Sequence, residues 1–221
     1  MRSLPKIFSQ QDPQWAKLPL GTSTNGATMG SDSCYVTSMA MVACYYGKST
    51  DPEQLNKFLI ANNLYVDGDL IGGDDTLNKV YPDINYEQDY FYPNQPPTPA
   101  DLTLLHSLMD DPTVSVILEI NLGNHQHFVV CTGCNGTTTI ADPESGTVID
   151  FKSLYGDPAT NIIKFVVFSG APATNAVSPL MYKGLNINDT ASMKVCVDVW
   201  DEVVNQGRSI RLVKKTIRKI K

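Results

Sequence analysis

The chain has no long apolar run, only 18% charged residues and only three histidines. No stretch approaches the roughly 18 apolar residues that a membrane-spanning helix requires, so we expect no transmembrane segment. The beginning of the chain also lacks the apolar stretch of a secretory signal, and we expect synthesis in the cytoplasm without Sec-type export. Three histidines leave few candidates for a general base or a metal ligand.

Five cysteines are an odd number, and they do not form the dense spacing of a disulfide-rich domain. This pattern favours free thiols and a reducing compartment. Cys131 and Cys134 form the sequence CTGC, a spacing found in metal and redox sites. Residues three apart on a strand point to opposite faces, and no second cysteine pair completes a zinc site. We therefore expect neither a metal ion nor a cofactor.

The charge is distributed unevenly along the chain. Residues 208–221 contain seven Lys or Arg and no acidic residue, which leaves ten basic against 23 acidic residues elsewhere. In this basic tail, Ile210, Val213, Ile217 and Ile220 repeat at spacings of three, four and three, as in a helical seam. Such a stripe predicts docking on a partner protein or an anionic surface, with a solvated tail as the alternative. Because the tail has no aromatic residue and the body is acidic, we expect no nucleic-acid binding.

Apolar periodicity predicts helices over residues 31–47, 50–63 and 98–111. After Pro112 the pattern becomes short, β-branched and separated by turn residues, which predicts strands. These strands are VSVILEI, HFVVCTGC, TTTIAD, TVIDF and NIIKFVVF. The glycine- and aspartate-rich segment DGDLIGGDD is expected to be a surface loop.

Helices followed by strands predict an α+β fold in which N-terminal helices pack on an antiparallel sheet. We expect one domain over residues 1–168 and a linker over 169–188, where small residues and proline are frequent. Residues 189–221 are predicted to form a C-terminal helical extension that ends in the basic tail.

Cys34 lies at the junction between a small polar loop and the first predicted helix. A cysteine there is either a nucleophile or a small buried apolar side chain. The free N–H groups at a helix N-terminus favour the thiolate, which supports the first interpretation. Cys44 lies near the opposite end of the same helix, and Cys196 lies within the predicted extension.

A cysteine nucleophile needs a base, and His127 is the best candidate because it begins a predicted strand that would hold its ring rigidly. His125 precedes it in a turn and is the weaker candidate, whereas His106 lies in a predicted helix. An imidazole base also needs an orienting acceptor. Asp142 ends the next predicted strand, so a hairpin would return it close to His127. Alternatively, a strand-edge histidine and an Asp-Pro turn are ordinary surface features.

Several segments in order resemble the peptidase C39-like family, relatives of papain-like cysteine peptidases. They are SQQDPQWAKLPLGTS, GSDSCYVTSMAMVACYYG, DPEQLN, HFVVCTG and IADPESG, within residues 7–168. The resemblance implies a papain-like fold with Cys34 as nucleophile, His127 as base and Asp142 as the orienting acid. It also implies that the Gln10 side-chain amide donates to the oxyanion beside the Cys34 backbone N–H.

Two positions depart from the family pattern. Ser33 stands where the family usually has glycine, and Tyr35 stands where many relatives have a small residue. Neither change removes a reacting group, and the bulkier loop is expected either to narrow the cleft or to change which backbone N–H points inward.

These observations lead to two hypotheses about function. The first is a thiol-dependent hydrolase that cleaves an amide bond in a polypeptide or a peptidoglycan peptide, as a component of a bacteriophage particle. The second is a peptidase-like interaction module that is attached to a larger assembly through residues 208–221. Capture of a cysteine-directed peptide electrophile at Cys34 favours the first.

Deletion of residues 208–221 is expected to leave the turnover of a small soluble amide substrate nearly unchanged and to abolish attachment to a partner. The basic tail lies outside the segments that resemble the peptidase family, so its predicted role is placement. The single change Ile217→Asp puts a charge into the predicted seam and keeps the cationic residues. If binding persists in this variant but weakens steeply with salt, the tail acts as an electrostatic tether and the seam model is wrong.

Overall fold

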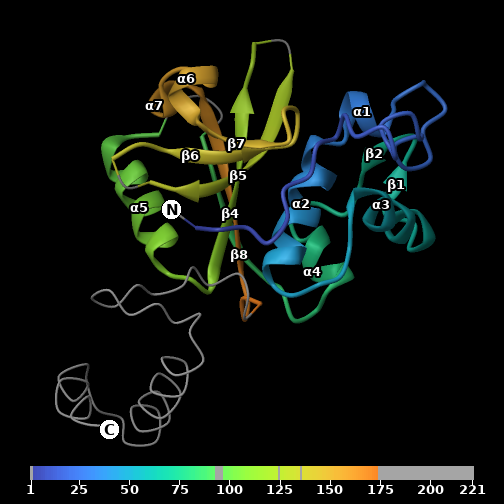
Figure 1. The fold of residues 1–221 in the computed structure, drawn as a ribbon, viewed down its shortest axis with the longest axis horizontal. Helices are drawn as coiled ribbons and strands as arrows, with labels where there is room; N and C mark the ends of the chain where they lie inside the picture. Colours follow the sequence, from blue (N-terminus) through green and yellow to red (C-terminus); the bar gives the residue numbers. More distant parts are fainter. Residues whose placement is uncertain (1, 93–96, 124, 135, 174–221) are drawn as a thin grey trace, which may run out of the picture. The chain divides into compact units, whose positions relative to one another are not determined.

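The structure is a computed structural model that describes residues 2–92, 97–123, 125–134 and 136–173 (Figure 1). The helices within these ranges are α1 (Met29–Asp32), α2 (Cys34–Tyr45), α3 (Pro52–Ala61), α4 (Thr76–Val80), α5 (Pro99–Asp110), α6 (Phe151–Tyr155) and α7 (Pro158–Asn161). The strands are β1 (Tyr65–Val66), β2 (Asp69–Leu70), β3 (Asn85–Phe91), β4 (Val114–Asn121), β5 (Gln126–Gly133), β6 (Thr139–Asp142), β7 (Thr147–Asp150) and β8 (Ile162–Ser169).

The main sheet has six strands in the order β3-β8-β4-β5-β6-β7, and every neighbouring pair is antiparallel. The predicted combination of helices with an antiparallel sheet is therefore confirmed. All five strands expected after Pro112 are present, although the fourth ends at Asp150 because Phe151 begins α6. The expected order of helices before strands was wrong in two respects: β3 precedes α5 and pairs with β8 at the sheet edge, and α6 and α7 lie between β7 and β8.

Both faces of the sheet are buried, because alternate apolar side chains along β4, β5 and β8 point to opposite sides. One face packs with α2 and α3 in a core that includes Ile117 and Val130. The other face packs with α5 and α6 in a second core that includes Leu105 and Phe151. Figure 1 shows α2 and α5 on opposite sides of β4.

Helix α2 is buried around most of its circumference, with ten of its twelve residues buried. Its sequence is apolar on all sides, which suits a helix enclosed between the sheet and α3. Polar side chains tie both halves of α2 to neighbouring backbone: Ser38 Oγ donates to Phe128 O at 3.1 Å, and the Tyr45 hydroxyl donates to Pro112 O at 2.6 Å. The first bond joins α2 to β5, and the second joins it to the segment between α5 and β4.

The helix predicted over residues 31–47 is divided at Ser33. This residue ends α1 and is also the N-cap of α2, so the long helix begins at Cys34. The structure thereby places Cys34 in the first turn of α2.

The segment expected to be a surface loop contains part of a hairpin. Tyr65 pairs with Leu70 and Val66 pairs with Asp69, which leaves Asp67 and Gly68 as a two-residue turn. Both turn residues have positive φ, 48° and 90°, as a type I′ turn requires. An Asp-Gly pair is a common hairpin signal, and the two-residue strands were too short to be recognised by periodicity.

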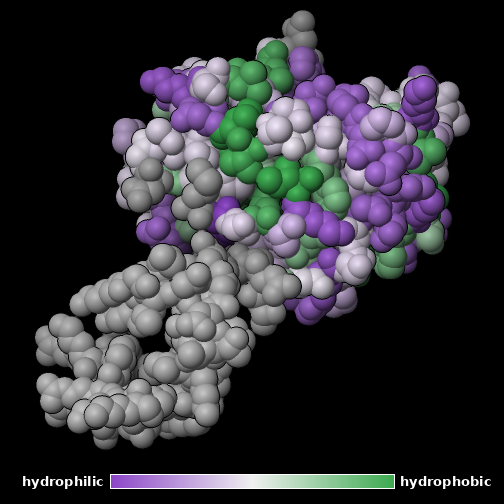
Figure 2. All heavy atoms as spheres, viewed as in Figure 1, coloured by the Kyte–Doolittle hydropathy of each residue, from purple (hydrophilic) through white to green (hydrophobic). Residues whose placement is uncertain are grey.

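No helix in the described ranges has the length and apolarity needed to cross a membrane. In the space-filling view of Figure 2, hydrophilic residues cover much of the right-hand side of the described surface, and an apolar band lies to the left of it.

Part of the predicted linker is described. Gly170 N–H donates to Thr113 O at 2.9 Å, and Ala173 N–H donates to Tyr45 O at 2.7 Å. The remainder of the linker, the helical extension over residues 189–221 and Cys196 lie outside the described residues.

Gly21→Ala is expected to destabilise the protein more than Gly26→Ala. Both glycines have positive φ, 55° and 91°, so an alanine costs about 1 kcal/mol of backbone energy at either site. A Cβ at Gly21 would lie 2.4 Å from Tyr65 Cγ, whereas a Cβ at Gly26 would meet nothing within 4 Å. The additional overpacking at Gly21 is about 1–3 kcal/mol. Urea unfolding followed by tryptophan fluorescence measures the difference, and equal losses would contradict the close packing against Tyr65.

Candidate active site

Cys34 is the first residue of α2, and its half-buried side chain lines a cleft of about 1140 Å³. Ser33, the N-cap residue, makes no side-chain hydrogen bond to the helix end. The N–H groups of the first turn are therefore free of a side-chain cap. Gln10 and His127 line the same cleft.

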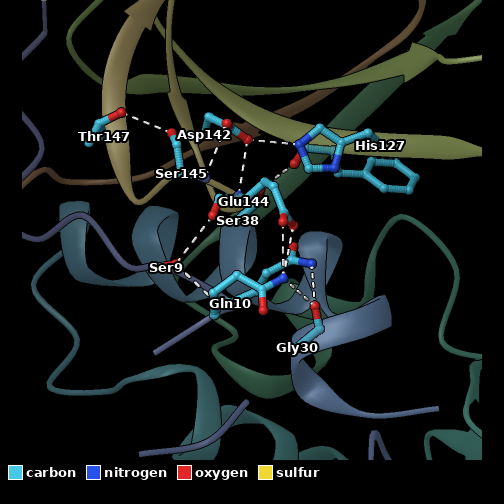
Figure 3. A network of polar contacts seen from close by, with 11 residues as sticks. Ser9, Gln10, Gly30, Ser38, His127, Asp142, Glu144, Ser145 and Thr147 are labelled. Atoms are coloured by element: carbon cyan, nitrogen blue, oxygen red, sulfur yellow. Dashed lines mark hydrogen bonds and ion pairs between the residues drawn. The ribbon is translucent and has the colours of Figure 1, made fainter. Parts of the chain in front are cut away.

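His127 and Asp142 form a buried hydrogen-bonded pair. His127 Nε2 lies 2.8 Å from Asp142 Oδ1, and the two residues are 7% and 0% exposed (Figure 3). Strands β5 and β6 are adjacent and antiparallel, as expected from the predicted hairpin. Because Asp142 occupies Nε2, the ring nitrogen left for another partner is Nδ1.

The carboxylate of Asp142 is held by the turn that follows it. The backbone N–H of Glu144 donates to Asp142 Oδ1 at 3.1 Å, and that of Ser145 donates to Oδ2 at 3.2 Å. Burial by itself raises the pKa of Asp142, but the hydrogen bonds from His127 and Glu144 outweigh burial and lower that pKa below its usual value. Asp142 is therefore ionised at neutral pH and favours a protonated His127.

The pKa of His127 is raised to about 9. Burial lowers this pKa, whereas the hydrogen bond with Asp142 and the interaction with Cys34 raise it by a larger amount. The ring also lies near that of Tyr155, with centroids 5.6 Å apart. At neutral pH the group beside Cys34 is thus an imidazolium, which stabilises a thiolate.

Gln10 lies beside this pair and is 3% exposed. Its backbone N–H donates to Pro143 O at 2.7 Å, and its side-chain Nε2 donates to Gly30 O at 2.8 Å (Figure 3). An amide nitrogen carries two hydrogens, so the second N–H remains for another acceptor. Gln10 Oε1 is buried and has no hydrogen-bond partner among the described residues.

Gln11 and Glu144, which the sequence did not indicate, connect the loop that carries Gln10 to the turn after Asp142. Gln11 Nε2 donates to Gly30 O at 2.8 Å and to the two carboxylate oxygens of Glu144 at 3.0 and 3.1 Å. The loop that carries Gln10 is thereby attached to the turn that follows Asp142. Nothing in the sequence distinguishes Gln11 and Glu144 from ordinary polar loop residues, because their partners are far away in the chain.

The other histidines lie apart from the buried pair. His106 is exposed on α5. His125 is also exposed, and it lines the same cleft as His127. Burial and the contact with Asp142 thus distinguish His127 from both.

The expectation that Cys131 and Cys134 point apart was wrong. Their sulfur atoms are 3.5 Å apart, because β5 ends at Gly133 and its pairing shifts between Cys131 and Gly133. In the part of the chain that the structure describes, no group of three or more His, Cys, Asp or Glu residues is arranged to hold a metal ion. Cys44 is buried, its thiol donates to Thr50 O at 3.3 Å, and burial raises its pKa.

The raised pKa of His127 predicts how stability depends on pH. The folded protein holds this proton more tightly than the unfolded chain, so the contribution of His127 is complete below about pH 6.5 and is lost as pH rises through about 9. Asp142→Asn removes the charge that favours the imidazolium. The free energy of unfolding should therefore fall more between pH 6.5 and pH 9 in the wild type than in Asp142→Asn, as measured by urea unfolding. Parallel curves would contradict the raised pKa.

Residues 7–155, which include Gln10, Cys34, His127 and Asp142, match the family model described as Peptidase_C39 like family. No curated protein is similar enough to the chain to match it. Since the match covers more than half of the chain, the protein belongs to the peptidase C39-like family.

Proposed function

We propose that the protein is a cysteine peptidase in which Cys34 is the nucleophile, His127 is the general acid and base, and Asp142 orients His127. The observation that carries the proposal is the 2.8 Å contact between His127 Nε2 and Asp142 Oδ1, which leaves Nδ1 for Cys34 at the N-terminus of α2. The family supports a peptide substrate.

In this mechanism the Cys34 thiolate attacks the scissile carbonyl carbon and forms a tetrahedral intermediate. The developing oxyanion accepts hydrogen bonds from the Cys34 backbone N–H and from the second Nε2–H of Gln10. The His127 imidazolium then donates its proton to the leaving nitrogen, the C–N bond breaks, and a thioester remains on Cys34. Neutral His127 next takes a proton from water, whose oxygen attacks the thioester, and collapse releases a carboxylic acid and the thiolate.

Asp142 contributes through the ring of His127. Its ionised carboxylate stabilises the imidazolium and fixes the ring plane, so the proton-carrying Nδ1 stays directed at the cleft. The backbone donors from Glu144 and Ser145 keep Asp142 ionised despite its burial.

The finer assignment of the substrate is also part of this proposal. A polypeptide and a peptidoglycan peptide present the same amide to Cys34. A role in a bacteriophage particle, in which the enzyme digests cell wall, is motivated by an enzyme domain joined to a basic tail. The alternative is a peptidase-like interaction module attached through residues 208–221, which lie outside the described residues.

Cys34→Ala and His127→Ala are each expected to reduce kcat/KM on the order of 10⁴-fold, because both groups act in one nucleophilic unit. His125→Ala is the matched control, since it removes an exposed imidazole from the same cleft, and most activity should remain. Turnover is measured with a library of internally quenched peptides and with purified peptidoglycan. If His125→Ala is inactive and His127→Ala is active, the base has been assigned to the wrong histidine.

Labelling with a peptide epoxide or vinyl sulfone distinguishes the peptidase from the interaction module. Mass spectrometry then identifies the modified cysteine. Specific modification of Cys34 in the wild type and its loss in His127→Ala support the peptidase. Preferential modification of Cys131 or Cys196, or absence of capture, would favour the interaction module.

A further inference from the structure

A row of side chains crosses the sheet beside the reacting groups. In the strand pairing, Glu119 of β4 lies opposite Phe128 of β5 and opposite Lys164 of β8. Directly opposite residues share a face of the sheet, so these three side chains lie on the same side. All three line the cleft that contains Cys34.

This row is close to the proposed catalytic groups. Phe128 follows His127 in the chain, and its ring lies 4.6 Å from that of Tyr35, which follows Cys34. Neighbouring strands are about 5 Å apart, so Glu119 lies within about two residues of extended substrate from the reacting atoms. A charge at Glu119 therefore acts on substrate residues next to the scissile bond.

The charges of Lys164 and its two carboxylate partners, Asp74 and Glu119, do not balance. Lys164 Nζ donates a hydrogen bond to Asp74 Oδ2 at 3.0 Å, and its distance to Glu119 Oε2 is 3.3 Å. The Lys164 ammonium thus pairs with two carboxylates, and the three groups together carry a net charge of −1. Glu119 is only 6% exposed, and Lys164 is the only polar contact of its side chain among the described residues. Burial raises the pKa of Glu119, and Lys164 offsets this only in part.

The charged residues that line the rest of the cleft are mostly acidic. Lys164 is the only Lys or Arg among the described residues that line it, whereas the acidic lining residues are Asp32, Asp67, Asp69, Asp74, Glu119 and Glu144. Apolar rings flank the row, since Phe91 lies beneath the ammonium of Lys164 at 5.3 Å and Tyr35 lies on Phe128. Such walls suit the aliphatic stem of a cationic side chain, whose charged end then reaches a carboxylate.

We infer that Glu119 is a specificity-determining residue and that the cleft selects peptides with a lysine- or arginine-like cation close to the scissile bond. This inference rests on the proposed peptidase function. The incoming cation forms an ion pair with Glu119 and offsets the charge that Lys164 leaves uncompensated. The substrate class is therefore a basic peptide or a peptide with a free side-chain amine.

The test uses internally quenched octapeptides that are uncharged except for a single lysine, which is placed at successive positions. The comparison peptides have norleucine in place of the lysine. At one or two adjacent positions, lysine should raise kcat/KM of the full-length wild type by about tenfold or more, since charged hydrogen bonds are worth more than neutral ones. The preference should weaken with added salt. Equal kcat/KM for every lysine and norleucine pair would overturn the inference, whereas cleavage of no peptide would overturn the proposed function.

Two single variants test the charge balance. Glu119→Gln and Asp74→Asn each bring the net charge of Lys164 and its two carboxylate partners to zero and leave Lys164 one carboxylate, so each should reduce the lysine-to-norleucine ratio toward one. The double variant carries a net charge of +1 and should prefer glutamate at the same position. Glu53→Gln is the matched control, because Glu53 pairs with Lys57 on α3 and does not line the cleft. A ratio that is unchanged in both single variants would overturn the assignment.

Binding provides a readout that does not need turnover. Fluorescence anisotropy of the labelled lysine and norleucine peptides with Cys34→Ala should show the same preference. Its loss in Cys34→Ala/Glu119→Gln is expected, and circular dichroism checks that this variant is folded. Equal affinities for both peptides in Cys34→Ala would contradict recognition by Glu119.

Discussion

The packing of helix α2 against strand β5 determines where the proposed catalytic groups lie. Cys34 begins the helix and His127 is the second residue of the strand, so their separation depends on how these two elements are held. The bond from Ser38 Oγ to Phe128 O joins the elements one helical turn from Cys34 and one residue from His127. Because α2 is also enclosed by the apolar core, it cannot shift along β5 without opening a cavity.

A second constraint attaches the beginning of the chain to the turn after β6. The Gln10 backbone bonds to Pro143, and Gln11 bonds to both Gly30 and Glu144. These bonds hold the loop that carries Gln10, helix α1 and the turn after Asp142 in one arrangement. Preorganisation of this kind matters because a hydrogen-bond donor stabilises an oxyanion only when it is already directed at the position where charge develops.

Electrostatics divide the cleft into two parts with different roles. Around His127 the charges are matched, since an imidazolium lies between a buried carboxylate and a thiol. Around Lys164 they are unmatched, since one ammonium lies between two carboxylates. The first arrangement supports proton transfer, and the second leaves a negative site for a cationic group. Both depend on burial, because solvent would screen the same charges on an open surface.

Sequence patterns were sufficient to predict the properties that depend on near neighbours. Helix caps, β-branched runs and the turn after Asp142 are local signals, and they predicted α2, the strands after Pro112 and the β5–β6 hairpin that brings His127 to Asp142. The order of short motifs predicted the family. The β1–β2 hairpin and β3 were missed because two-residue strands and a largely polar edge strand carry too little periodicity.

Contacts between residues far apart in the chain were visible only in the folded structure. The pairing of Glu119 with Lys164, the approach of Asp74 to that pair, and the bridge from Gln11 to Glu144 join segments far apart in the chain. Strand register places Glu119 opposite Lys164, and the loop between β2 and α4 brings Asp74 to Lys164. The separation of Cys131 and Cys134 likewise depended on an irregular strand end, where the alternation of an ideal strand no longer holds. Such contacts arise from the packing of whole elements, so no local pattern of residue types specifies them.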